Sequence, residues 1–236
     1  IKTNDSQLKM AEALAYNREG IGLIGGMEEM DGGNYHHPLP LTQEQKDYIK
    51  FFKDYFDYYS GTKNIADVAV LHTFNSMAYN NDRPYQSTFL FEQSLIQGKV
   101  PFDVIFDEQL KNLDRYKVLV LANQECLTDD QQELVRSFVQ KGGGLVITEH
   151  TSLYNAWHQR KDNFGLADLI KVKAPDWHDR RTPEAILPIP EQRNEIGKGR
   201  VIYLPEVIPS VSKPTMVPMA GPYFKLAKNH QQLIDG

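Results

Sequence analysis

The sequence predicts an α/β fold, built on a parallel sheet with helices on both faces. From residue 65 to about 207, short runs rich in β-branched apolar residues alternate with helical patterns. These runs are apolar along their whole length, which is typical of strands that are buried on both faces. Glycines and helix-capping residues mark the boundaries between the two kinds of segment. This order indicates a doubly wound, flavodoxin-like sheet.

The length of 236 residues fits one large domain, or one domain with a flanking piece. Apolar residues make up 41% of the chain, which is enough for a sizeable core. The net charge is −5, with acidic and basic residues interspersed, so we expect no nucleic-acid partner. No apolar run reaches about 18 residues, so we expect no membrane span. Because the chain begins with Ile1, we expect an excised fragment or a processed form, and the single cysteine leaves open whether its compartment is the cytoplasm or the periplasm.

Residues 1–64 differ in character from the rest of the chain. Helical spacing of apolar residues predicts a helix over 8–16, and an apolar run before two glycines predicts a short strand over 21–26. An aromatic-rich helix is predicted over 43–59. Thr42 and Gln45 have the spacing of a capping box at its start, and Ser60-Gly61 is typical of a helix end.

The strand and helix patterns of residues 65–207 follow one another in a regular order. The predicted strands are 67–74, 102–106, 117–123, 145–148 and the run within 197–205. The predicted helices are 85–97, a short turn over 108–116, 129–140 and a short one within 163–170. We expect a long loop over 75–84. The stretch 151–197 is less clear apart from that short helix, and its proline-rich segments could be edge strands or loops. Residues 208–236 are predicted to be irregular.

The best-defined helix begins after Thr128. Its hydroxyl can cap the first turn, and Asp129 and Asp130 suit the positive end of the helix dipole. Three glycines, 142–144, end the helix. The residues expected to form its buried stripe are Leu134, Val135, Phe138 and Val139.

Polar residues follow the strand over 145–148 directly. Glu149 and His150 could form an acid/base pair that faces a cleft, since ligands of α/β sheets bind near the carboxyl ends of strands. They could equally be polar side chains at an ordinary strand end. Thr151 and Ser152 offer hydroxyls, but no small residues flank them as in a nucleophile elbow. We therefore expect no strained turn here that exposes a nucleophile.

The single cysteine, Cys126, excludes an intrachain disulfide and a CxxC metal site. It lies near the start of the helix at 129, which would favour a thiolate. The neighbouring Glu125 would disfavour that charge. A buried cysteine that behaves as a small hydrophobic residue is the favoured interpretation, because free cysteine is usually buried.

We expect neither a metal nor a cofactor. His36 and His37 are adjacent, so on an extended chain they point to opposite sides and do not chelate one ion together. The glycine-rich stretches lack the spacing of nucleotide-binding loops. Residues 197–200 are instead predicted to form a hairpin-like turn. Trp157 and Trp177 could stack on a sugar ring or pack at a subunit interface, and the sequence does not separate these alternatives.

Several phrases, taken together, resemble a known family. They are NIADVAVLHTFNSMAYN, the run from PFDVIFDEQ through GGGLVITEHTSLYN, NFGLADLI and GKGRVIYLP. This order resembles the trimerisation domain of bacterial β-galactosidases and related glycoside-hydrolase-like proteins, which has a class I glutamine-amidotransferase-like fold. The resemblance covers residues 65–207, and its most specific part runs from Tyr116 to Thr148.

The resemblance implies a division of the chain into three parts. Residues 1–64 look like the closing part of a glycosidase (β/α)8 barrel, 65–207 like the trimerisation domain, and 208–236 form an irregular segment. In amidotransferases of this fold, the strand equivalent to 145–148 ends in a cysteine nucleophile, whereas this chain has Glu149 and His150 there.

The resemblance therefore implies a structural, homo-oligomerising part of a protein that acts on carbohydrate, with no catalytic residue of its own. The alternatives are a free-standing hydrolase or amidotransferase-like enzyme using Cys126 or Glu149 and His150, and a carbohydrate-binding module using Trp157 and Trp177.

Overall fold

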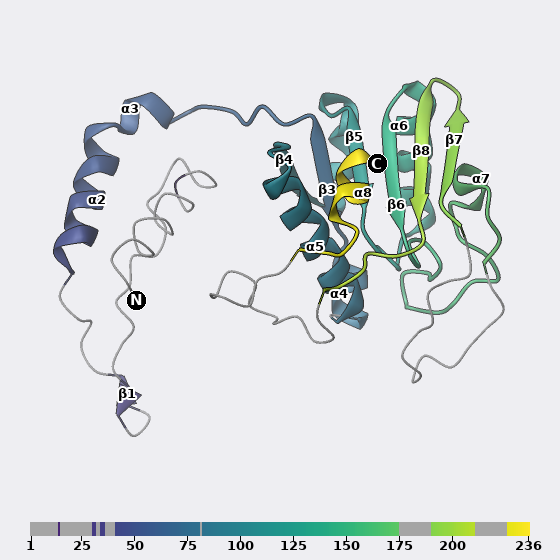
Figure 1. Cartoon of the computed structure of the whole chain (residues 1–236), viewed down its shortest axis with the longest axis horizontal. Coiled ribbons are helices and arrows are strands. Elements are labelled where there is room, and N and C mark those ends of the chain that lie inside the picture. The colour runs from purple at the N-terminus through teal and green to yellow at the C-terminus, as the bar shows by residue number, and fades with distance from the viewer. Residues whose placement is uncertain are drawn as a thin grey trace. The chain divides into compact units, whose positions relative to one another are not determined.

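The computed structural model describes residues 14, 30–31, 34–35, 41–80, 82–174, 190–210 and 226–236. The chain forms two compact units, Ile1–Asn64 and Ile65–Gly236 (Figure 1). Apart from Leu14, which is helical, the helix and strand predicted before residue 27 lie outside the described residues. The same holds for His36, His37 and Trp177.

Besides the helical Leu14, the described part of the first unit contains a small hairpin and helices α2 and α3. Strands β1 (Met30–Asp31) and β2 (Asn34–Tyr35) pair antiparallel. Helix α2 (Gln43–Asp54) begins with the predicted capping box, in which Gln45 N–H donates to Thr42 Oγ1 at 3.3 Å and Thr42 N–H donates to Gln45 Oε1 at 2.8 Å. The prediction of one continuous helix over 43–59 was wrong in one respect. The backbone breaks at Tyr55, and α3 (Phe56–Tyr59) follows separately.

The second unit is built on a six-stranded sheet with the order β4-β3-β5-β6-β8-β7. The first five strands in this order are parallel, and β7 pairs antiparallel with β8 at one edge. This confirms the α/β, flavodoxin-like prediction. The strands are β3 (Val68–His72), β4 (Phe102–Phe106), β5 (Val118–Leu121), β6 (Gly144–Thr148), β7 (Gln192–Ile196) and β8 (Gly199–Leu204).

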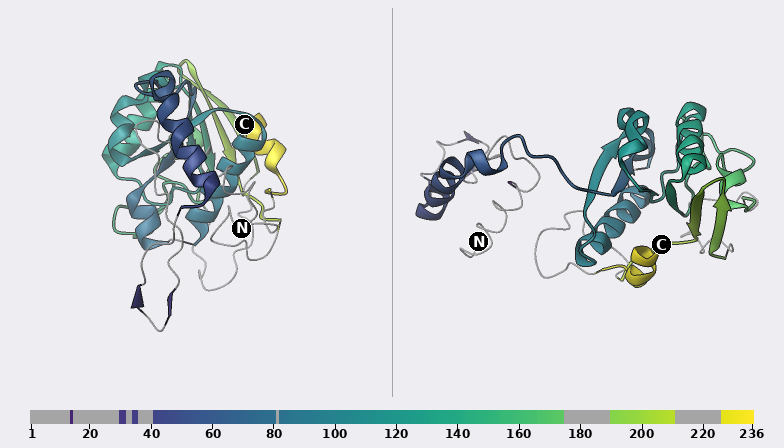
Figure 2. Two further views of the ribbon diagram at one scale, coloured as in Figure 1. Left: turned by 90° about the vertical axis from the view of Figure 1, so that its left-hand side faces the viewer. Right: turned by 90° about the horizontal axis from the view of Figure 1, so that it is seen from above.

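Helices cover both faces of this sheet (Figure 2). The helices are α4 (Phe74–Tyr79), α5 (Arg83–Gln97), the 3-10 helix η1 (Asp107–Arg115), α6 (Asp129–Lys141), α7 (Ala167–Ile170) and α8 (His230–Asp235). One core lies between the sheet and η1, α6 and α7, and includes Leu113, Val135 and Leu169. The other lies between the sheet and α5 and α8, and includes Phe91 and Leu233.

Local sequence signals account for most of these elements. Thr128 and Gln131 form a capping box at the start of α6, and Gly142 ends the helix with a left-handed φ of 121°. Gly197 and Lys198 form the predicted hairpin turn, which joins β7 to β8.

Two segments differ from the expectation. The predicted loop over 75–84 contains α4, whose first turn is capped by the Thr73 hydroxyl. The C-terminal segment, predicted to be irregular, ends in α8, which packs beside α5. Among the described residues, no helix has both the length and the apolar character that a membrane crossing requires.

Gly199 provides a test of how closely α6 packs at the end of the hairpin. A Cβ at this position would lie 2.2 Å from Val139 O and 2.4 Å from Gly143 O, so the backbone would have to move. We expect Gly199→Ala to lower the free energy of unfolding by about 3 kcal/mol, as overpacking does. Urea denaturation measures this, with the exposed Lys198→Ala as a near-neutral control. Equal stability of the two variants would contradict the described packing.

Candidate functional site

The topological switch point of the sheet lies between β3 and β5. After β3 the chain adds β4 on one side of it and then crosses to add β5 on the other side. The buried side chain of Gln124 joins the ends of β3 and β5. Its Oε1 accepts from Thr73 N–H at 2.8 Å and from Thr73 Oγ1 at 3.0 Å. Its Nε2 donates to Thr88 Oγ1 and to Ala122 O, both at 2.9 Å. The position where doubly wound proteins commonly hold a ligand is thus occupied by the chain's own amide.

Cys126 is fully buried in the core beneath α6. Its backbone N–H donates to Ser76 Oγ at 2.9 Å, and the residue forms a bridge with Tyr154. The surroundings are apolar, with Leu127 and Leu153 in the same cluster. This placement fits a small hydrophobic residue, because a thiolate is disfavoured in an apolar, desolvated environment.

The backbone is strained at two neighbouring strand ends. Glu149 follows β6 with a φ of 53°, and Asn123, just beyond β5, has a φ of 51°. Left-handed conformations cost non-glycine residues about 1–3 kcal/mol and persist where surrounding contacts enforce them. The turn after residue 148 is therefore strained, whereas our expectation concerned a strained turn that exposes a nucleophile, and Glu149 is only 3% exposed. The turn resembles a nucleophile elbow in its backbone, although it lacks the small flanking residues of that motif.

Hydrogen bonds hold this turn to the sheet. Glu149 N–H donates to Leu204 O at 3.0 Å, and Tyr203 OH donates to Glu149 O at 3.0 Å. The Asn123 side chain accepts from His150 N–H at 3.1 Å. These bonds come from β8 and from the end of β5, so the two adjacent strands enforce the strained geometry.

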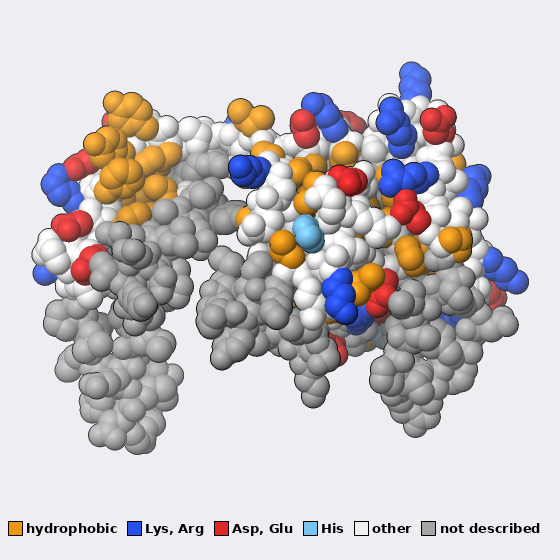
Figure 3. Space-filling view, in the orientation of Figure 1, with side chains coloured by type: hydrophobic (Ala, Val, Ile, Leu, Met, Phe, Trp, Pro, Cys, Tyr) orange, Lys and Arg blue, Asp and Glu red, His pale blue; other side chains and the backbone are white. Residues whose placement is uncertain are grey.

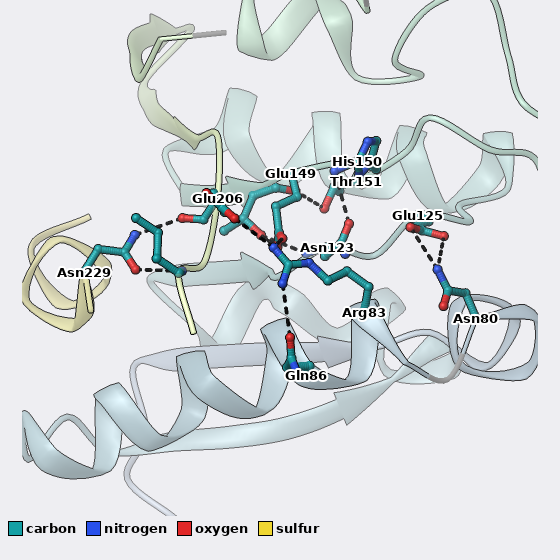
Figure 4. Close-up of polar contacts among 12 residues, drawn as sticks. Asn80, Arg83, Gln86, Asn123, Glu125, Glu149, His150, Thr151, Glu206 and Asn229 are labelled. Atoms are coloured by element: carbon teal, nitrogen blue, oxygen red, sulfur yellow. Dashed lines mark hydrogen bonds and ion pairs between the residues drawn. The ribbon is translucent and has the colours of Figure 1, made fainter. Parts of the chain in front are cut away.

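The Glu149 side chain turns inward to an ionic cluster (Figure 4). Nη2 of Arg83, at the start of α5, lies 3.1 Å from Glu149 Oε1 and 3.0 Å from Glu206 Oε1. Arg83 Nη1 donates to Gln86 Oε1 at 3.1 Å, and Thr148 Oγ1 donates to Glu149 Oε2 at 3.1 Å. We name Arg83, Glu149 and Glu206 the carboxylate cluster.

Burial dominates the electrostatics of this cluster. The pKa of Glu149 is raised to about 7, first of all by burial and to the smallest extent by the nearby Glu206 charge, while Arg83, Ser87 and Thr148 oppose the rise. The pKa of Tyr203 is also raised, by burial first and by the Glu149 charge second. The carboxyl of Glu149 therefore has the proton affinity of an acid/base group.

The other polar residues of this strand end are also enclosed. His150 is only 5% exposed, so neither it nor Glu149 lies at an open surface. The Thr151 hydroxyl accepts from Gln124 N–H at 2.9 Å and lies 2.8 Å from Thr148 O. Ser152 Oγ accepts from Leu166 N–H at 3.1 Å. Both hydroxyls are thus engaged in holding the turn.

A second polar group lies beside the first and has no signal in the sequence. Glu125, buried after β5, accepts from Asn80 Nδ2 at 3.2 and 3.3 Å and lies 3.1 Å from His158 Nε2. The His158 ring stacks on Tyr79 and Tyr154, with centroid distances of 5.6 and 4.7 Å. Because Glu125 and His158 are far apart in the sequence, only the fold brings them together.

The remaining candidate residues lie apart from these groups. Trp157 is 74% exposed on the loop next to His158, and Trp177 lies outside the described residues. No group of three His, Cys, Asp or Glu residues with the arrangement of a metal site occurs within the described ranges.

Comparison with known proteins identifies the fold. No protein-family model matches the sequence, and no curated protein matches it either. The structure is similar to that of a catalytic mutant of a GH42 β-galactosidase from G. stearothermophilus, with a TM-score of 0.58 and 19% identity over 69% of this chain and 30% of that chain.

Two other β-galactosidases match over a comparable share. The enzyme from Bacillus circulans sp. alkalophilus gives a TM-score of 0.56 at 16% identity, over 69% of this chain and 31% of that one. The enzyme from Halorubrum lacusprofundi gives 0.54 at 17% identity, over 68% and 31%. The matched part of the chain thus spans about a third of the length of these enzymes. At these identities the likeness establishes a shared fold.

The burial of Cys126 predicts that its thiol reacts slowly with reagents in the solvent. We expect Ellman's reagent to modify it at least about 100-fold more slowly in the folded chain than in denaturant, because the reagent must wait for an opening of the core. The control is a Cys126→Ala variant with cysteine introduced at the exposed Lys198, which should react at the denatured rate. Rapid modification of native Cys126 would contradict its placement in the core.

Proposed function

We propose that this chain is a structural, oligomerising part of a glycoside-hydrolase-like protein related to the β-galactosidases. In this proposal residues 65–207 correspond to the trimerisation domain and residues 1–64 to the end of a (β/α)8 barrel. The parent protein acts on carbohydrate, and the catalytic carboxylates come from the rest of the barrel. The fold shared with β-galactosidases supports this assignment.

The observation that carries the proposal is the position of Glu149. An enzyme that uses covalent catalysis on such a turn needs a nucleophile that a substrate can reach. Here the residue after β6 is a carboxylate that is 3% exposed and bound to Arg83. The only thiol of the chain, that of Cys126, lies in the core instead. These placements argue against the alternative of an amidotransferase-like enzyme that uses Cys126 or Glu149 and His150.

The surface of β4 supports self-association. This strand forms an edge of the sheet, and its exposed face carries Val104 and Phe106, which are 41% and 53% exposed. Phe74, at the start of α4, is 72% exposed. Apolar side chains on an unpaired edge strand are typical of a subunit contact.

The first unit offers further apolar surface. Hydrophobic side chains gather over α2 and α3 (Figure 3), where Phe51, Tyr55 and Tyr58 are 47%, 48% and 80% exposed. The Phe51 and Tyr55 rings pack with their centroids 4.8 Å apart, so the exposed rings form a continuous ridge. Such a ridge suits an outer barrel helix that packs on the rest of its domain.

Self-association is testable by light scattering coupled to size exclusion. We expect the chain to form a homo-oligomer at micromolar concentration, and Val104→Lys with Phe106→Lys to weaken association by about tenfold or more, because charges would be buried in the contact. Ile96→Lys, on an exposed position of α5, is the matched control. A monomeric wild-type chain would contradict the proposal, as would hydrolysis of 4-nitrophenyl β-galactoside or glutamine by the chain.

Carbohydrate binding is a second candidate function, favoured by the exposure of Trp157. An indole ring that is 74% exposed offers a flat apolar face for a sugar ring. If the loop binds sugar, galactose or a galacto-oligosaccharide should shift the tryptophan emission with millimolar affinity. Trp157→Ala should then abolish the change, whereas Trp177→Phe should leave it. An unchanged spectrum up to about 100 mM sugar rules this candidate out.

A further inference from the structure

We propose that the carboxylate cluster is a proton-controlled latch, which holds the segment after β8 against α5 and loosens it as the pH rises. This inference goes beyond the structural role proposed above and does not depend on it. The cluster joins three separate elements. Arg83 opens α5, Glu149 follows β6, and Glu206 lies two residues beyond β8.

A single nitrogen of Arg83 serves both carboxylates. Nη2 lies 3.1 Å from Glu149 and 3.0 Å from Glu206. The Glu149 side chain is 4% exposed, that of Glu206 is 16% exposed and that of Arg83 is 33% exposed. When both carboxyls are ionised, the cluster carries one excess negative charge in a poorly solvated site, which is unfavourable. A proton on Glu149 leaves Arg83 and Glu206 as a balanced pair.

The two carboxylates are not held equally. Glu149 is bound by Arg83 and by the Thr148 hydroxyl, and its backbone is fixed by Leu204 and Tyr203. Glu206 is bound by Arg83 through Oε1 only. Its buried Oε2 has no hydrogen-bond partner within the described part of the chain. Because an unpaired buried oxygen is costly, Glu206 is the member of the cluster that leaves most easily.

Every charged or titratable group that faces Glu149 among the described residues takes part in this balance. Arg83 comes from α5, Tyr203 from β8 and Glu206 from the segment after β8. His150 follows Glu149 directly, and its backbone is bound to Asn123. The cationic member is Arg83, so a second carboxylate charge is not offset by another cation of this set.

The segment that Glu206 secures is joined to α8. Asn229 Nδ2 donates to Glu206 O at 2.9 Å, and Ile208 N–H donates to Asn229 Oδ1 at 2.9 Å. Lys228 N–H donates to Ile208 O at 2.7 Å. Residues 205–210 and 227–235 therefore form one hydrogen-bonded flap beside α5. Release of Glu206 loosens this flap while β6 and β8 keep their pairing.

The direction of the pH effect follows from the proton affinity of Glu149. Burial is the main cause that raises the pKa of Glu149 in the closed cluster to about 7, and the Glu206 charge adds to the rise. Release of Glu206 removes that charge and leaves Glu149 with Arg83, so the pKa of Glu149 is lower in the open state. The closed state thus binds the proton more tightly than the open state. Its added stability is fully present at low pH, is lost as the pH rises through the closed-state value of about 7, and changes no further above it.

Hydrogen exchange measured by mass spectrometry tests the latch. After correction for intrinsic rates, exchange in peptides covering 205–210 and 226–236 should accelerate between pH 5 and 7, by up to about tenfold per pH unit, and then level off. A peptide covering β6 should show no such change. A wild-type flap whose opening does not depend on pH would overturn the proposal.

Two isosteric variants test whether the Glu149 and Glu206 carboxyls cause the pH dependence. Glu149→Gln removes the titrating carboxyl, so the flap should stay as closed at pH 8 as at pH 5. Glu206→Gln removes the competing charge and should reduce the pH dependence as well. Glu195→Gln, at an exposed position on β7, is the control and should behave like wild type. If Glu149→Gln fails to fold, Glu206→Gln decides. An unchanged pH dependence in the foldable variants overturns the latch.

Discussion

Burial of the sheet on both faces is the constraint on which the rest of the structure depends. Ala69, Leu119 and Val201 lie in strands at the centre and are 0% exposed. A strand enclosed in this way has no place for polar side chains along its length. Polar residues are therefore displaced to the ends of the strands. The carboxyl edge of this sheet consequently combines tight enclosure with a high density of hydrogen-bonding groups.

At that edge, side chains supply hydrogen bonds to backbone groups that have no backbone partner. Gln124 links the ends of β3 and β5, and Thr151 supports the turn after β6. Such networks are stable only when nearly every donor and acceptor is matched. Matching is incomplete in and around the carboxylate cluster, since Glu206 Oε2, Asn123 Nδ2 and Ser87 Oγ are buried without a hydrogen-bond partner in the described structure. The weakest part of the edge is thus also its most highly charged part.

The sequence predicts those features that depend on local patterns. Thr42 and Thr128 signal the starts of their helices because capping requires only residues within one turn. The hairpin at Gly197 is predicted for the same reason. In contrast, β7 is an edge strand made mostly of polar residues, so the sequence has no apolar run there that would indicate a strand. Contacts between distant residues, such as Glu125 with His158, leave no local pattern to detect.

The strained turn at Glu149 was missed for a related reason. Small residues usually mark such turns, and they are absent here. The left-handed backbone is enforced by bonds from β8 and from Asn123, which belong to other strands. The pairing of Glu149 with Arg83 likewise joins a strand end to a helix far away in the sequence. The sequence places Glu149 at the end of a strand, but only the folded structure shows which way its side chain points.

The antiparallel strand β7 makes the two borders of the sheet chemically different. It presents Arg193 and Glu195 on exposed positions, whereas β4 presents Val104 and Phe106. A stack that grows by repeating one contact would have to join the charged border of one copy to the apolar border of the next, which is unfavourable. The sheet is therefore protected against open-ended, fibre-like extension.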